Sequence, residues 1–95
     1  MLPTLTEFRT FCRSIEGEVL LTQARAKPFS VALVAGSLYF IPVSSGKKRK
    51  ADQAGISQVI VRLSKTGSQV QAQYKDITFN ASYILEIIRQ WQVRR

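Results

Sequence analysis

Residues 29–43 read FSVALVAGSLYFIPV, and this stretch decides the fold. Two short runs of aliphatic and aromatic side chains flank Gly36-Ser37, a residue pair that suits the two-residue type II′ turn of a β-hairpin. The pattern therefore predicts antiparallel strands over residues 29–35 and 38–43. Pro42 has no N–H to donate to a ladder, so it belongs near a strand end or on an edge.

Both faces of this hairpin are apolar. With the turn at Gly36-Ser37, Leu33 lies opposite Phe40 and Val34 lies opposite Tyr39, which are favourable pairs of aliphatic and aromatic side chains. A sheet that helices cover on one side needs only one apolar face. We therefore expect the second face either to be covered by the C-terminal part of the chain or to be used in an oligomer.

Amphipathic periodicity on either side of the hairpin predicts helices. Thr4 and Glu7 have the spacing of a capping box at the start of the first helix. Apolar residues three and four apart predict a second helix that ends before Gly67 and begins anywhere from Ser45 to Asp52. Asn80 is a good N-cap for a third helix, which is the most hydrophobic of the three and ends in the basic tail 94–95.

The remaining segments complete a single domain, residues 1–95. Residues 18–24 are rich in aliphatic side chains and predict a first strand. Residues 68–75 alternate between polar and apolar side chains, which fits either a short edge strand or an ordered loop. We expect an α+β fold with a three-stranded antiparallel sheet, or four strands if residues 68–75 form one, packed against two or three helices. The element order is then α-β-β-β-α-(β)-α.

Composition argues against an enzyme. The chain has no His and one Cys, which excludes imidazole catalysis and zinc sites built from Cys and His clusters. Cys12 lies on the apolar face of the first helix and is expected to be buried. The carboxylates do not have the spacing of a metal-dependent nuclease centre, and no Gly-rich phosphate loop is present. We expect a non-catalytic protein with no metal, no cofactor and no small-molecule substrate.

Charge indicates the class of partner. Fourteen Lys and Arg against six Asp and Glu give a net charge of +8, and four of the cations are consecutive: Lys47, Lys48, Arg49 and Lys50. Next to the start of the second helix these cations oppose the helix dipole, whereas a bound phosphate there would be favourable. We predict that they are the main contacts to nucleic-acid phosphates, with Arg25 and Lys27 as secondary contacts. A solvated loop or a nuclear-import signal would have the same composition.

The order of one helix, three strands and a basic helix start resembles the double-stranded RNA-binding domain over about the first two-thirds of the chain. That family contacts RNA through its first helix, the loop between its first two strands and lysines at the start of the following helix. Here these places hold residues 7–13, Arg25 with Lys27, and residues 47–50. The Gly-Pro-x-His loop of the family is absent, and residues 68–95 extend beyond its usual end. The resemblance implies sequence-independent contact with a nucleic-acid backbone.

Two functions from different classes follow from these patterns. The first is non-catalytic, sequence-independent binding of DNA or RNA by the basic segment. The alternative is a small interaction or homodimeric assembly module, because the hairpin and the last helix carry excess apolar surface. Among the aromatic residues, Phe79 is predicted to lie in or near the core, whereas Tyr39, Tyr74 and Tyr83 are better candidates for exposure. No segment is long and apolar enough to span a bilayer, so we expect a cytoplasmic protein, or a nuclear one in a eukaryote.

Overall fold

The structure is a computed structural model that describes residues 1–94; Arg95, the last residue of the predicted basic tail, lies outside the described residues. The fold is α+β, as predicted. Its elements in chain order are α1 (Leu5–Ser14), β1 (Leu20–Leu21), β2 (Pro28–Val34), β3 (Ser37–Pro42), β4 (Arg49–Lys50), α2 (Gln53–Thr66), the 3₁₀ helix η1 (Gln71–Tyr74) and α3 (Ala81–Val93).

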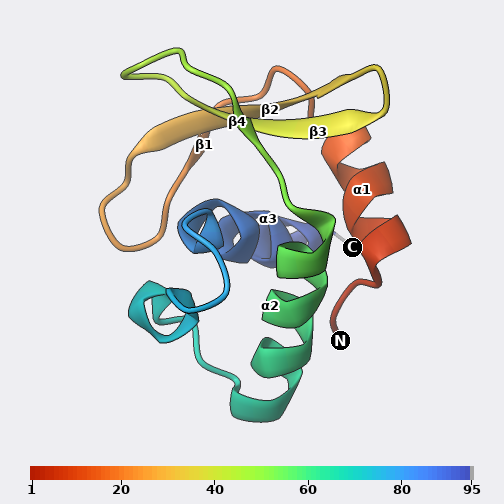
Figure 1. Cartoon of the computed structure of the whole chain (residues 1–95), viewed down its shortest axis with the longest axis vertical. Coiled ribbons are helices and arrows are strands. Elements are labelled where there is room, and N and C mark those ends of the chain that lie inside the picture. The colour runs from red at the N-terminus through yellow and green to blue at the C-terminus, as the bar shows by residue number, and fades with distance from the viewer. Residues whose placement is uncertain (95) are drawn as a thin grey trace.

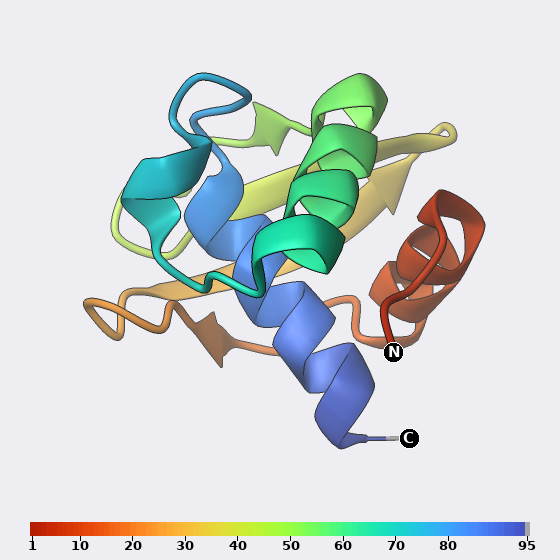
Figure 2. The ribbon, with the colours of Figure 1, turned by 90° about the horizontal axis from the view of Figure 1, so that it is seen from below.

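The four strands form one antiparallel sheet in the order β1-β2-β3-β4, and the helices all lie on the same side of it (Figures 1 and 2). Helix α3 runs beneath the sheet, with α1 and α2 beside it. This arrangement makes two layers, with the core between the helices and the inner face of the sheet. Within residues 1–94 no helix covers the outer face. Of the two alternatives for this face, cover by the C-terminal part of the chain is therefore wrong, and use in an oligomer stays a prediction.

The hairpin between β2 and β3 forms at a different turn from the one predicted. Leu33 pairs with Leu38 and Val34 with Ser37, so the two turn residues are Ala35 and Gly36 rather than Gly36 and Ser37. Ala35 and Gly36 both have positive φ, 52° and 82°, as a type I′ turn requires. The partner of each residue moves by two positions, which preserves the direction of every side chain because strands alternate with a period of two.

Residues that alternation places on one face of the hairpin therefore stay on one face, and the structure shows which face is the inner one. Phe29, Val31 and Phe40 are buried against the helices. Ala32, Val34, Tyr39 and Ile41 point to the uncovered side, where all of them keep some exposure and Val34 is 45% exposed.

Helix α1 starts as predicted. The Thr4 side chain accepts a hydrogen bond from the Glu7 N–H, and the Glu7 carboxylate accepts one from the Thr4 N–H, which completes the capping box. Helix α2 begins at the latest of the predicted positions. Asp52 is its N-cap and accepts from the Ala54 N–H at 3.1 Å, and Gly67 ends the helix in the left-handed conformation.

The fourth strand lies earlier in the chain than predicted. Residues Arg49–Lys50 pair with Tyr39 and Phe40 as β4, so the basic segment belongs to a hairpin and not to a helix start. The segment 68–75 is not a strand but contains η1. Its backbone folds back on itself because the Tyr74 hydroxyl donates a hydrogen bond to the Ser68 carbonyl at 2.7 Å.

Helix α3 is the centre of the core. It is buried on most sides, including Ile84, Ile87 and Ile88, as expected for a helix that is apolar almost all round. Two aromatic predictions are wrong: Tyr74 is fully buried, and Phe79 is 89% exposed. Within residues 1–94 no helix combines the length and hydropathy that a membrane span needs.

Candidate functional site

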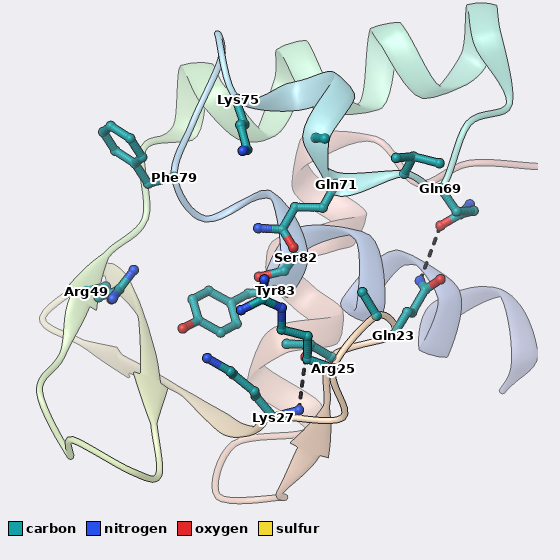
Figure 3. A pocket seen from close by; sticks show the side chains of 14 residues that line it. Gln23, Arg25, Lys27, Arg49, Gln69, Gln71, Lys75, Phe79, Ser82 and Tyr83 are labelled. Carbon is teal, nitrogen blue, oxygen red and sulfur yellow. Dashed lines mark hydrogen bonds between the residues drawn. The ribbon is translucent and has the colours of Figure 1, made fainter.

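One cavity of the structure is an open cleft of about 680 Å³, a volume within the roughly 300–1,000 Å³ typical of ligand sites. Three parts of the chain enclose it: the loop between β1 and β2, strand β4, and the segment from Gln69 to Tyr83 (Figure 3). Its charged lining residues are Arg25, Lys27, Arg49 and Lys75. No Asp or Glu is among the described residues that line it. The cleft therefore gathers four positive charges from distant parts of the sequence.

Thr22 shapes the loop that carries Arg25 and Lys27. This residue is almost fully buried, and its hydroxyl accepts a hydrogen bond from the Lys27 N–H at 3.0 Å. The Thr22 N–H donates to the Lys27 carbonyl at 3.0 Å, and the Ala26 N–H donates to the Thr22 carbonyl at 2.9 Å. These bonds hold both ends of the loop, so the two cations are carried on a short, well-connected turn.

Strand pairing directs Arg49 into the cleft. Arg49 lies opposite Phe40, whose side chain is in the core, and paired residues project from the same face of a sheet. The Arg49 guanidinium lies 6.0 Å from the centre of the Tyr83 ring. That ring packs in turn on Phe29 at 4.8 Å and Phe40 at 5.5 Å between ring centres. The Arg49 guanidinium therefore makes a cation–π contact with Tyr83, a ring that two further aromatic side chains hold in place.

Helix α2 anchors the wall of the cleft that the segment from Gln69 to Tyr83 forms. Arg62 donates two hydrogen bonds to the Asp76 carboxylate, at 2.7 and 3.0 Å, and one to the Gln73 carbonyl at 2.8 Å. The hydrogen bonds from Arg62 lower the pKa of Asp76 below its usual range. Lys75 lies between these two anchored residues, and its side chain points toward the cleft (Figure 3). A hydrogen bond of 3.2 Å between the Gln23 and Gln69 side chains joins the two walls at one end.

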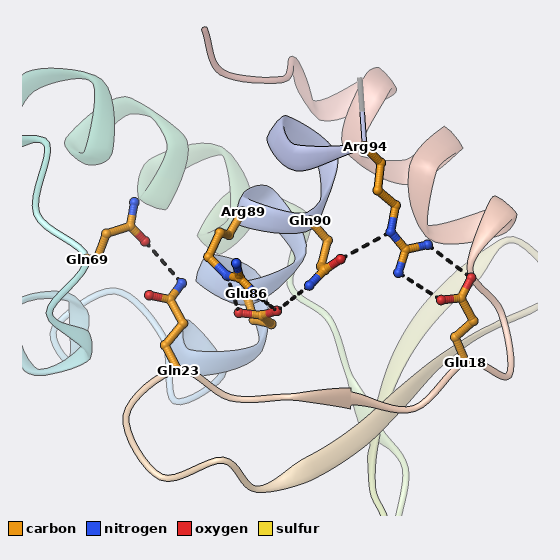
Figure 4. Close-up of polar contacts among 7 residues, drawn as sticks. All are labelled: Glu18, Gln23, Gln69, Glu86, Arg89, Gln90 and Arg94. Atoms are coloured by element: carbon orange, nitrogen blue, oxygen red, sulfur yellow. Dashed lines mark hydrogen bonds and ion pairs between the residues drawn. The ribbon is translucent and has the colours of Figure 1, made fainter.

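The six carboxylates of the chain are all engaged away from the cleft. Glu86, buried in α3, binds Arg89 and Gln90, and Glu18 binds Arg94 through two hydrogen bonds of 2.8 and 3.1 Å (Figure 4). The remaining four are accounted for by the Asp76–Arg62 pair and by hydrogen bonds to backbone N–H groups at Glu7, Glu16 and Asp52. Within residues 1–94 no salt bridge neutralises a cation of the cleft.

The predicted contact residues divide between two sides of the molecule. Arg25, Lys27 and Arg49 line the cleft together. Lys47, Lys48 and Lys50 do not. Lys50 pairs with Tyr39 and therefore projects from the outer face of the sheet. The Lys48 ammonium lies 5.8 Å from the Tyr39 ring on the same side, and Lys47 lies in the turn before β4.

The basic run 47–50 lies before α2 and not in its first turn. Residues 47–50 are separated from α2 by Ala51 and by Asp52, and the Asp52 carboxylate already occupies an N–H group of the first turn. Sequence reasoning also missed Lys75 and Phe79 as cleft residues. A single Lys is an ordinary surface residue, and only the position of Phe79 directly before the N-cap Asn80 hinted that its ring lies outside the helix.

Two observations on the described residues concern metal-ligating groups and the one thiol of the chain. Residues 1–94 hold no group of three or more His, Cys, Asp or Glu that could bind a metal ion. Burial raises the pKa of the Cys12 thiol to about 12, so the thiolate that a nucleophile needs is suppressed. No family model, no curated protein and no solved structure matches this chain. Strand β4 and the N-cap at Asp52 also depart from the element order and the basic helix start on which the resemblance to the double-stranded RNA-binding domain was based.

Proposed function

We propose that this protein binds nucleic acid without catalysis, through contacts between the cations of the cleft and backbone phosphates. The observation that carries the proposal is the charge of the cleft: Arg25, Lys27, Arg49 and Lys75 line it with no carboxylate among them. Four like charges around one cavity repel one another, and a polyanion removes that repulsion while releasing its own counterions. Arg and Lys side chains are also the usual partners of phosphate oxygens.

The ion pairs of the protein strengthen the argument. A basic loop that served only for solubility would not need a shaped cavity. An acidic protein partner would have to place its own carboxylates against the cations of the cleft. Here the carboxylates are used to brace α3 and η1, and the cations of the cleft are left for a ligand. A cytoplasmic location, or a nuclear one in a eukaryote, belongs to this proposal because the partner is found there.

The test compares two charge variants of equal net charge. In one, Arg25, Lys27, Arg49 and Lys75 are changed to Gln; in the control, Lys47, Lys48, Lys50 and Lys65 are changed to Gln. Fluorescence anisotropy with a labelled oligonucleotide gives log K against log salt between about 50 and 200 mM. For four single-strand phosphates we expect the cleft variant to flatten the slope by about 3. Equal effects of both variants, or no binding by the natural protein at low salt, would contradict the proposal.

A second candidate function is supported by the uncovered outer face of the sheet. Ala32, Val34, Tyr39 and Ile41 form an apolar strip there that no element within residues 1–94 covers. Exposed apolar surface on a small protein is typical of an interaction site. Assembly through this strip leaves the cleft accessible, because the two surfaces lie on opposite sides of the sheet.

A further inference from the structure

We infer that the cleft takes single-stranded rather than duplex nucleic acid and that one unpaired base stacks on Phe79. This inference rests on the proposed function and adds the class of nucleic acid to it. It comes from a combination of groups at one place: an aromatic ring that faces solvent and four cations that line the same cavity (Figure 3).

Phe79 has no structural role that explains its exposure. The side chain is 89% exposed, although phenylalanine is among the residues most often buried. Within residues 1–94 it makes no ring or cation contact of the kind that Phe29, Phe40 and Tyr83 make. A ring in this position is costly to solvate, and a base that stacked on it would remove apolar surface of both groups from water.

The backbone around Phe79 is nevertheless anchored. The N–H of Thr78 donates to the Tyr74 carbonyl at 3.2 Å, and the N–H of Asn80 donates to the Thr78 hydroxyl at 3.1 Å. Helix α3 follows directly, held by its buried face. The ring therefore projects from a backbone that is already held at the rim of the cleft, so the backbone need not be ordered when a base binds.

The exposed ring favours a single strand. In a duplex the bases are paired and stacked on one another, so a base can stack on a side chain only after it is flipped out of the helix. Here the cations line a concave cleft, and the exposed ring stands at its edge. Single-strand sites combine these two features, a positive groove for the backbone and an aromatic side chain for a base.

The decisive variant is Phe79→Ala, measured by anisotropy with labelled oligo-U and oligo-dT of about 12 nucleotides, within the roughly 4–16 that small single-strand modules cover. We expect binding to weaken by about 5- to 100-fold with an unchanged salt slope, because stacking carries no counterion release. Phe79→Tyr should bind like the natural protein, whereas Phe79→Leu should lose most of the affinity. Because the side chain is exposed, the melting temperature should not change.

Three outcomes would overturn the inference. Phe79→Ala could leave single-strand binding unchanged while the four-residue cleft variant reduces it; the proposed function would then stand and the stacking would fail. A blunt duplex of the same length could bind as tightly as the single strand. Uridine monophosphate could compete as well as the oligonucleotide, which would indicate a mononucleotide site. If neither charge variant reduced the salt dependence of binding, that result would instead contradict the proposed function itself.

Discussion

At the scale of single residues, Cys12 gives a clear pH prediction. Its side chain is fully buried, and burial raises the pKa of the thiol from 9.0 to about 12. Between these two values the unfolded chain loses the thiol proton and the folded chain keeps it, so the unfolded state is favoured as the pH rises. We expect the free energy of unfolding to fall by about 1.4 kcal/mol per pH unit above pH 9 from this group alone.

The measurement is urea denaturation between pH 8 and 10.5, for the natural protein and for Cys12→Val, which has no thiol. All other side chains are the same in both proteins and contribute equally to both pH dependences. The difference between the two slopes therefore isolates Cys12. Parallel slopes would contradict the burial of the thiol, as would rapid alkylation of Cys12 in the folded protein.

The sequence predicts the burial of some aromatic side chains but not of others. Helical spacing placed Phe8 and Trp91 in the core, and the structure agrees. Tyr74 has no such spacing. It is buried because its hydroxyl finds the Ser68 carbonyl, a partner that only the folded path of residues 68–74 supplies. The prediction for Phe79 was wrong because this residue precedes the N-cap Asn80 and therefore does not belong to the buried face of α3.

At the scale of elements, the turn between β2 and β3 carries removable strain. Ala35 has φ of 52°, a left-handed conformation that costs a residue with a Cβ about 1–2 kcal/mol. Asn tolerates this region better, and Asn-Gly is the preferred pair of a type I′ turn. We expect Ala35→Asn to stabilise the protein by about 1 kcal/mol and to raise its melting temperature by several degrees. Calorimetry would measure the shift.

Ala24→Asn is the matched control, because Ala24 is also exposed and has no positive φ. Its expected effect is within about 0.5 kcal/mol. If both variants changed stability equally, the gain at position 35 would come from the Asn side chain and not from the backbone of the turn.

Strand β4 could not be predicted from the sequence, and the reason is physical. Two residues are too short to show a period, and Arg49 and Lys50 have no strand propensity that distinguishes them from a loop. They are held as a strand by tertiary pairing with Tyr39 and Phe40, and the Ala51 N–H continues the ladder by donating to the Leu38 carbonyl at 2.8 Å. This pairing also decides the site, because alternation along β4 sends Arg49 to one face and Lys50 to the other.

At the scale of the whole molecule, the net charge of +8 predicted an anionic partner but not where it would bind. The basic run drew attention to residues 47–50. The structure instead brings together cations from three separate segments and uses the carboxylates to brace the scaffold. Such a distribution depends on contacts between residues as far apart as Glu18 and Arg94, which neither composition nor local spacing encodes.

We expect dimerisation through the outer face and nucleic-acid binding in the cleft to depend on salt concentration in opposite directions. The short edge strands β1 and β4 offer little ladder for pairing with another sheet, so self-association would use the outer face. A two-fold dimer would place the apolar strip of one copy on that of the other and would bring Lys48 and Lys50 of both copies together. Salt screens this repulsion over about 10 Å at 0.1 M and leaves apolar burial intact. We therefore expect a monomer at low salt and weak dimerisation as salt rises, while nucleic-acid binding weakens.

Sedimentation velocity at micromolar concentration from about 50 to 500 mM salt tests this expectation. Val34→Lys adds a charge at the most exposed residue of the strip and should abolish the dimer, because each interface would then contain two further buried cations. The same substitution should leave oligonucleotide binding unchanged, since Val34 does not line the cleft. An association that weakens with salt, or one that survives Val34→Lys, would assign the contact to another surface.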